Sequence, residues 1–311
     1  MRKAVLDLGT NTFHLLIADV SASGIRILFQ DTIAVKIGEG GINKGFIAEE
    51  AFARGVSVVK DFARILLKHS VAEVKAAGTA ALRTASNGPE FIDRVKRETG
   101  ITIEIIDGDS EARLIYEGVK HGVRLSEERV LIMDIGGGSV EFIICNREGI
   151  FWKKSYPLGA AKLMDLFHHN DPISIDEVEQ IHRHLDENLQ ELKKVSEHFK
   201  PLTLIGSAGS FETFATLVVR KFHLPQELLQ ASEFTFDLNQ LREVSREILT
   251  STHDERAASP DIIPVRVDMI VVATVLTEYI LKSLNFSKMK LSTYALKEGL
   301  LYADQDGMMP K

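Results

Sequence analysis

The sequence predicts an α/β protein of two similar domains that face each other across a cleft. Two short segments share one design, Asp7 to Thr12 (DLGTNT) and Asp134 to Ser139 (DIGGGS). Strand-like runs surround each segment and then alternate with helical patterns, so a βββαβα unit is expected twice. A length of 311 residues leaves room for two domains with separate cores.

Each of the two segments predicts a strand, a tight turn and a second strand. Glycine lets backbone N–H groups approach an anion closely, and an Asp at a strand end can hold a divalent cation. Two such turns facing each other would hold a chain of phosphates from both sides. The candidate phosphate-binding residues are Thr10, Asn11, Thr12, Gly137, Gly138 and Ser139. The candidate metal ligands are Asp7, Asp134 and Glu141, the last on the second arm of the Asp134 hairpin.

Hydrophobic periodicity places the elements of the first unit. The expected strands are Val5–Leu8, Phe13–Val20, Ile25–Ile37, Glu73–Ala77 and Thr102–Ile106. The expected helices are Ala48–His69, Gly88–Thr99 and a third from Asp109 or Ser110, as its N-cap, to His121. Gly100 is expected to cap the second of these helices.

The pattern restarts after a polar stretch, His121–Arg129, which is the expected domain boundary. The expected strands are Val130–Ile135, Val140–Cys145, Ile150–Tyr156, Leu202–Ile205 and Met289–Ser292, with mostly helical chain between the last two. The expected helices are Ala160–Phe167, Ile175–Phe199, Phe211–Phe222 and Leu296–Ala303. Domain I is predicted to comprise residues 1–122 and a C-terminal helix at 300–311, and domain II residues 123–299.

Two such units with a cleft between them describe the ribonuclease H-like architecture of actin, hexokinase and the heat-shock ATPases. A dinucleotide-binding fold fits less well, because its glycine turn leads directly into a helix. Here both glycine turns return to a strand.

Composition narrows the function further. The net charge of −7 argues against general nucleic-acid binding, which normally needs a basic face. One cysteine, Cys145, permits no intrachain disulfide and fits a reducing, cytoplasmic compartment. The N-terminus enters a strand pattern at once, without the apolar region of a signal peptide. The longest apolar run, Met269–Leu276, is far short of the ~20 residues that span a membrane, so no membrane association is expected.

Taken together, the motifs resemble one family. The two turns occur in order with Ser110–Val119 (SEARLIYEGV), Gly206–Ser210 (GSAGS), Arg266–Ile270 (RVDMI) and Leu296–Gly299 (LKEG). This series is similar to the exopolyphosphatase and guanosine pentaphosphate phosphohydrolase family, in its short two-domain form. The resemblance implies Mg²⁺-dependent hydrolysis of a terminal phosphate from polyphosphate or guanosine pentaphosphate.

The resemblance also implies roles for single residues. Glu111 would activate the attacking water, and Asp134 and Glu141, with Asp7 opposite, would hold Mg²⁺ or its water shell. Arg83 would clamp a phosphate. Two simpler interpretations stay open: Glu111 as a first-turn glutamate favoured by the helix dipole, and Arg83 as a solvated surface residue.

Four further residues would complete the phosphate site: Gly206, Ser207, Ser210 and Arg266. Arg266 precedes a long apolar helix, and its alternative role is an ion pair with Asp268. The loop that contains Gly206, Ser207 and Ser210 ends a strand and starts a helix, which is a ready anion site. Its alternative role is an ordinary helix-start turn.

The chain departs from the family pattern in several places. Val140 replaces a common Thr, Ala295 and Lys297 replace Gly and Arg, and Lys36 replaces an Arg. Lysine keeps the charge of arginine but loses its bidentate geometry, so these changes bear on substrate preference.

Two other classes of function stay open. A non-catalytic sensor of polyphosphate or guanosine polyphosphates would bind without releasing phosphate. A kinase of the same architecture would need a phosphate acceptor. The amphipathic helix expected at Ile175–Phe199 could also serve a homodimer contact.

Overall fold

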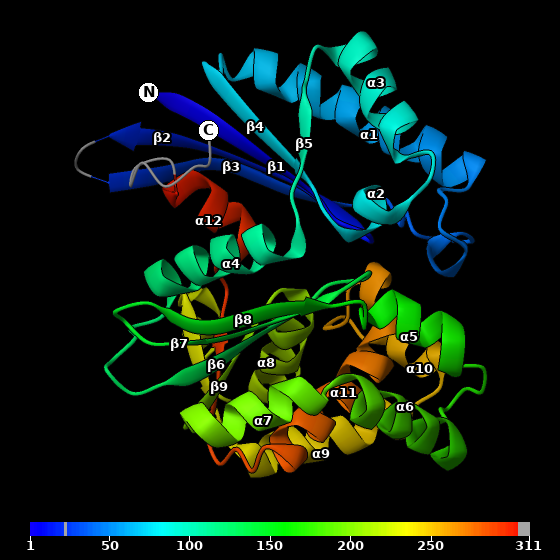
Figure 1. The fold of residues 1–311 in the computed structure, drawn as a ribbon, viewed down its shortest axis with the longest axis vertical. Helices are drawn as coiled ribbons and strands as arrows, with labels where there is room; N and C mark the ends of the chain where they lie inside the picture. Colours follow the sequence, from blue (N-terminus) through cyan, green and yellow to red (C-terminus); the bar gives the residue numbers. More distant parts are fainter. Residues whose placement is uncertain (22–23, 304–311) are drawn as a thin grey trace.

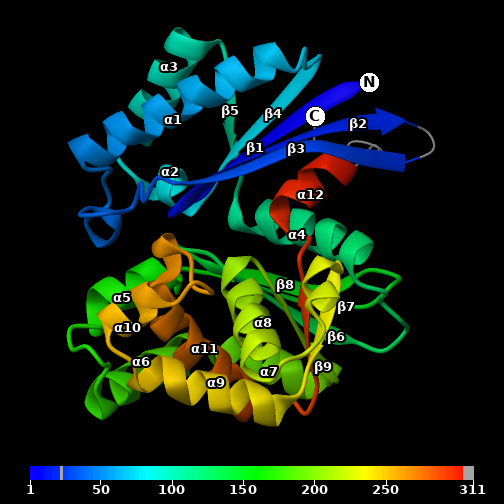
Figure 2. The ribbon, with the colours of Figure 1, turned by 180° about the vertical axis from the view of Figure 1, so that it is seen from behind.

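The computed structural model describes residues 1–21 and 24–303. It contains two mixed β-sheets, each covered by helices, stacked with two helices between them (Figures 1 and 2). This is the two-domain, actin-like α/β fold that the sequence predicts. Within the described residues, no helix has both the length and the apolar character required to cross a bilayer.

The first sheet has five strands in the order β3-β2-β1-β4-β5. They are β1 (Arg2–Leu8), β2 (Thr12–Ser21), β3 (Gly24–Ala34), β4 (Glu73–Gly78) and β5 (Ile103–Ile105). The first three form an antiparallel meander, whereas β4 and β5 run parallel to β1.

The second sheet repeats this order. Its strands are β6 (Val130–Ile135), β7 (Val140–Cys145), β8 (Ile150–Tyr156), β9 (Thr203–Ser207), β10 (Glu233–Phe236) and β11 (Met289–Ser292). The order β8-β7-β6-β9-β11 reproduces the first sheet, again with a meander followed by parallel strands. β10 adds an antiparallel edge strand. The predicted duplication is therefore confirmed at the level of strand order.

Twelve α-helices are seen in the described part of the chain. They are α1 (Glu49–Lys68), α2 (Ala80–Thr84), α3 (Gly88–Thr99), α4 (Gly108–Gly122), α5 (Ala160–Phe167), α6 (Ile175–Asn188), α7 (Gln190–Phe199), α8 (Gly209–Lys221), α9 (Leu238–Thr250), α10 (His253–Ala258), α11 (Met269–Ser283) and α12 (Leu296–Tyr302). Short 3₁₀ turns occur at η1 (Ile42–Lys44), η2 (Gln226–Gln230) and η3 (Pro264–Arg266).

Strand alternation divides each sheet between two cores, because successive side chains point to opposite faces. On β1, Leu6 and Leu8 pack with α1 and α3. Val5 points to the other face and joins a central cluster formed with residues of α4 and α12. On β6, Met133 faces the helices of the second domain and Ile132 joins that same central cluster. The central cluster thus holds the facing sheets together through α4 and α12 (Figure 1).

A close crossing of α4 and α12 positions the cleft. A Cβ on Gly118 would lie 2.0 Å from the carbonyl oxygen of Ala295, and one on Gly299 would lie 1.8 Å from that of Leu114. Only glycine permits the two backbones to approach this closely. The crossing places the first turns of both helices, with Glu111 and Lys297, at the cleft.

Several expectations need correction. The helix expected at Ile175–Phe199 is two helices, broken at Leu189, where φ is −102° and ψ is 19°. The N-cap of α4 is Asp107, whose carboxylate accepts from the N–H of Ser110, and not Asp109 or Ser110. The short strand β10 lies in chain that was expected to be helical.

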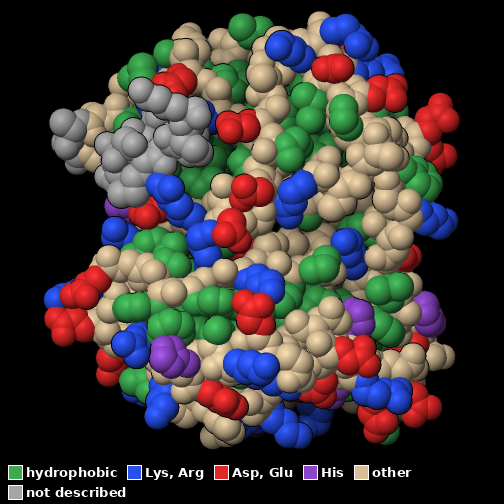
Figure 3. All heavy atoms as spheres, viewed as in Figure 1, with side chains coloured by type: hydrophobic (Ala, Val, Ile, Leu, Met, Phe, Trp, Pro, Cys, Tyr) green, Lys and Arg blue, Asp and Glu red, His purple; other side chains and the backbone are tan. Residues whose placement is uncertain are grey.

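The domain division after residue 122 stays a prediction. The last described helix, α12, packs on α4 and β1 of the first domain. Most of the segment predicted to close that domain, 300–311, lies outside the described residues, which end at 303. On the face drawn in Figure 3, acidic and basic side chains are interspersed.

Candidate active site

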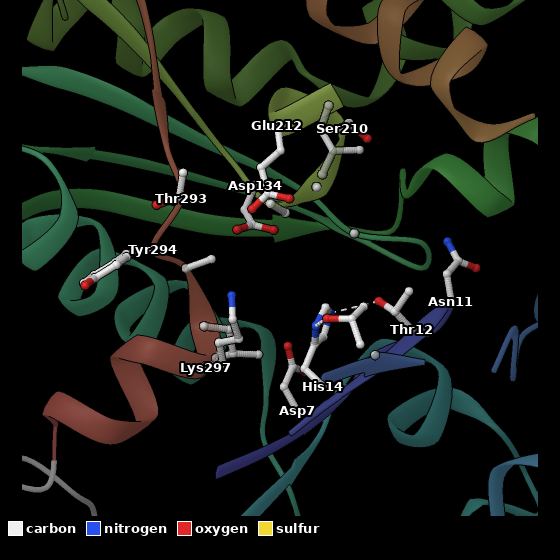
Figure 4. Close-up of a pocket in the computed structure, with 18 of the residues that line it drawn as sticks. Asp7, Asn11, Thr12, His14, Asp134, Ser210, Glu212, Thr293, Tyr294 and Lys297 are labelled. Carbon is white, nitrogen blue, oxygen red and sulfur yellow. Dashed lines mark hydrogen bonds between the residues drawn. The ribbon is translucent and has the colours of Figure 1, made fainter. Parts of the chain in front are cut away.

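A cleft between the two sheets encloses about 780 Å³. Both domains line it (Figure 4). The predicted site residues on its wall are Asp7, Thr10, Asn11, Thr12, Glu111, Asp134, Gly137, Gly138, Ser139, Ser210 and Arg266. Four others, Arg83, Glu141, Gly206 and Ser207, lie outside the wall.

The two hairpin turns have the same backbone hydrogen bond. The N–H of Gly9 donates to the carbonyl of Thr12 at 3.1 Å, and that of Gly136 donates to Ser139 at 3.0 Å. The repeat seen in the sequence is thus a repeat of turn geometry.

The turns also face each other directly. A Cβ on Gly137 would lie 2.3 Å from Asn11 Nδ2, and one on Gly138 would lie 2.8 Å from Thr10 Oγ1. The absence of side chains on the second turn therefore lets the first turn approach it across the cleft.

The backbone carbonyls of the two turns accept hydrogen bonds, whereas four backbone N–H groups of the turns are unpaired within the described residues. The carbonyl of Asn11 accepts from Val35 and Lys36, and that of Gly137 accepts from Ala161. The N–H groups of Thr10, Asn11, Gly137 and Gly138 donate to no protein acceptor within residues 1–21 and 24–303. Four unpaired N–H groups at one cleft can donate to the oxygens of an anion.

Strand alternation directs the acidic residues into the same space. Asp7 shares a β1 face with Val5, and Asp134 shares a β6 face with Ile132, so both point toward the central layer. Burial, and then Glu111, raises the pKa of Asp7 to about 8. Burial also raises the pKa of Asp134 to about 6, although a hydrogen bond from Ser207 opposes the shift.

Glu141 lies directly opposite Asp134 in the antiparallel β6–β7 pair. Its side chain is almost fully buried, and Oε1 accepts from Ser155 Oγ at 2.6 Å. Burial, with the charges of Glu111 and Asp134, raises the pKa of this carboxyl well above its ordinary value. Glu141 therefore sits behind the wall of the cleft, next to Asp134.

Glu111 stands in the first turn of α4, buried but on the wall of the cleft. Its Oε2 accepts from Arg83 Nη1 at 2.9 Å, and the same Arg83 nitrogen donates to the carbonyl of Ile106. Burial raises the pKa of Glu111 to about 7, against the opposing effect of Arg83. A carboxylate with such a pKa can accept a proton from water near neutral pH.

Arg266 reaches the cleft from the turn before α11. It donates to Thr213 Oγ1 at 3.0 Å and to Glu212 Oε2 at 3.2 Å. The ion pair with Asp268 considered above does not form; Asp268 instead accepts from His253 Nδ1 at 2.6 Å. Ala208, beside Arg266 on the wall, has φ of 70°, a strained value for a residue with a Cβ.

The structure adds wall residues that the motifs did not identify as site residues. His14 Nε2 lies 2.9 Å from Thr12 Oγ1, and Nδ1 lies 2.9 Å from Thr32 Oγ1. Burial lowers the pKa of His14 to about 3, so the ring is neutral. Lys297 and Glu298 also line the cleft. Both belong to the LKEG motif, which was the signal available in the sequence.

A metal ion would need more than protein ligands here. Within the described residues, no three His, Cys, Asp or Glu side chains are grouped so that they could hold a metal by themselves. Two of the carboxylates on the wall, Asp7 and Asp134, come from opposite sheets.

Comparison with known proteins agrees with the site. The family model described as the Ppx/GppA phosphatase family matches residues 16–307. The chain is 30% identical to exopolyphosphatase 1 of Mycobacterium leprae over 308 residues, covering 98% of this chain and 90% of the relative.

Solved structures extend the match. An exopolyphosphatase from Cytophaga hutchinsonii superimposes with a TM-score of 0.97 at 41% identity, covering 99% of both chains. A Ppx/GppA protein of Aquifex aeolicus, at 24% identity, has the same fold with a TM-score of 0.80, covering 100% of this chain and 99% of that chain. The chain therefore belongs to the Ppx/GppA phosphatase family.

Proposed function

We propose that this protein is a Mg²⁺-dependent exopolyphosphatase that releases the terminal phosphate of inorganic polyphosphate by attack of water. The observation that carries the proposal is the set of four free backbone N–H groups on facing turns, next to a buried glutamate with a pKa of about 7. The turns bind phosphate oxygens, and the glutamate acts on water.

Each residue then has a task. The amides of Thr10, Asn11, Gly137 and Gly138 hold the terminal phosphoryl group and stabilise its developing charge. Glu111 orients the attacking water and takes its proton, and Arg83 fixes the carboxylate through one hydrogen bond. Arg266 supplies positive charge from the opposite domain.

The residues present fit a hydrated magnesium ion. Mg²⁺ keeps several waters and usually takes one or two carboxylates besides substrate oxygens, which agrees with the pair Asp7 and Asp134. When bound, the ion would neutralise phosphate charge in a site whose own carboxylates repel an anion. Glu141 would support Asp134 from behind, since burial keeps it out of the cleft wall.

The relatives support polyphosphate as the substrate, because those in Mycobacterium leprae and Cytophaga hutchinsonii carry the name exopolyphosphatase. Guanosine pentaphosphate presents the same terminal group and is the alternative substrate. A non-catalytic sensor is the alternative of another class. We place the protein in the cytoplasm, in line with its single cysteine, which is buried and free.

Phosphate release tests the proposal. Polyphosphate, guanosine pentaphosphate and ATP are each incubated with the protein, with Mg²⁺ or with a chelator. Release from polyphosphate that requires Mg²⁺ supports it, and faster release from guanosine pentaphosphate favours the alternative. Tight binding of either compound without release under any metal would favour the sensor.

A further inference from the structure

We propose that Lys297 binds a phosphate oxygen of the substrate at the floor of the cleft, and that Glu298 holds its ammonium group in position. The substrate class rests on the function proposed above. The assignment of Lys297 rests on its own contacts.

Glu298 is fixed at both carboxylate oxygens. Its Oε2 accepts from the backbone N–H of Ala295 at 2.9 Å, which caps α12, and its Oε1 lies 3.0 Å from Lys297 Nζ. The side chain of Glu298 is only 6% exposed. A carboxylate held in this way leaves little freedom to the ammonium group bound to it.

The backbone at Lys297 is also held in place by packing. The residue stands in the first turn of α12, which crosses α4 at Gly118 and packs on β1. These elements carry Glu111 and Asp7, so the position of Lys297 is tied to that of the candidate catalytic groups.

The ammonium group points into the cleft from the side of Asp7 and His14, toward Asp134 on the opposite wall (Figure 4). A lysine offers three N–H donors. In the described chain, Glu298 is the one carboxylate within 4.0 Å of Lys297 Nζ. The other donors are therefore directed at the space that a substrate would fill.

The acidic residues of the cleft make a cation such as Lys297 necessary for binding an anionic substrate. An anionic substrate meets Asp7, Asp134 and Glu111 on the wall. Arg83 is paired with Glu111 and lies outside the wall, and the charge of Arg266 is partly offset by Glu212. Burial lowers the pKa of Lys297, but Glu298, Glu212 and Asp7 more than offset this, so the pKa is raised and the group stays charged.

Binding of methylenediphosphonate, a non-hydrolysable phosphate pair, is the test, measured by calorimetry with Mg²⁺ and with chelator. Because Lys297→Met loses a charged hydrogen bond to the probe, we expect it to bind methylenediphosphonate roughly 10- to 100-fold more weakly than the wild type. Lys297→Arg, which keeps the charge, should stay within about fivefold of the wild type. Lys290→Met is the matched control, because Lys290 on β11 lies outside the cleft wall and pairs with Glu233 on β10. This variant should bind as the wild type does.

The KM for polyphosphate should rise with the loss of binding in Lys297→Met, with a smaller change in kcat. Wild-type affinity in a folded Lys297→Met protein overturns the inference. If that variant does not fold, Glu298→Gln decides: weaker binding supports the inference and unchanged binding overturns it.

The two proposals can fail separately. Phosphate release by the wild type together with full affinity in Lys297→Met would remove Lys297 and leave the proposed function intact. Binding that depends on Lys297, in a protein that releases no phosphate, would support the role of Lys297 and contradict the proposed function.

Discussion

Arg83 and Glu111 form a partly buried ion pair in which Arg83 Nη1 lies 2.9 Å from Glu111 Oε2. Their side chains are 22% and 8% exposed, so solvent screens the pair only in part. The pair opposes the effect of burial on Glu111 and keeps the pKa of its carboxyl at about 7.

Changing Arg83 should therefore move the pH profile. Glu111 accepts a proton only when ionised, so kcat/KM of the wild type should rise with pH through about 7. Arg83→Met removes a charge that lowers the pKa of Glu111, so the rising limb should move to higher pH. Arg83→Lys should move it less. A profile that keeps its midpoint in Arg83→Met would contradict the role given to the pair.

Asp7 should make the metal-free protein less stable as the pH rises. Its pKa is about 8 in the folded state and ordinarily 3.8, so the folded chain holds a proton that the unfolded chain has lost. Where the folded state binds more protons, stability falls with rising pH, here between pH 4 and 8.

Asp7→Asn should remove this contribution. In chelator, its Tm should exceed that of the wild type at pH 8 by about 2–5 °C, with a smaller difference at pH 5. Thermal unfolding at both pH values measures this. The control is Asp93→Asn, which changes an exposed carboxylate on α3. An equal difference at both pH values would show that the carboxyl of Asp7 does not titrate as described.

Gly209 controls the position of Arg266. A Cβ at this residue would lie 1.7 Å from Arg266 Nη2, so Gly209→Ala must displace the guanidinium group. The expected result is a KM for polyphosphate roughly 10-fold higher, with the fold retained. Gly149→Ala is the control, since its Cβ would meet no atom within 4 Å. An unchanged KM in Gly209→Ala would argue against phosphate binding by Arg266.

Local patterns predicted the parts of the fold that depend on local geometry. The two Asp-x-Gly turns, the β6–β7–β8 meander and β11 were found in the sequence because alternation and glycine placement mark strands and tight turns. The four-residue strand β10 was missed although Phe234 and Phe236 alternate, because so short a run carries little signal. The break at Leu189 was missed because leucine continues the apolar spacing of the helix.

Contacts between residues far apart in the chain could not be predicted from the sequence. Arg266, in the turn before α11, pairs with Glu212 of α8, whereas the nearby Asp268 was the partner suggested by the sequence. Lys297 reaches the cleft because Gly118 and Gly299 let two helices cross closely, a contact between residues far apart in the chain.

The most direct measurement is phosphate release from polyphosphate by Glu111→Gln. The amide cannot take a proton from water, so kcat should fall by roughly two to four orders of magnitude while the fold and KM are nearly unchanged. The control is Asp109→Asn, an exposed first-turn carboxylate of the same helix, which should retain wild-type turnover. Wild-type turnover in Glu111→Gln would contradict water activation by this residue.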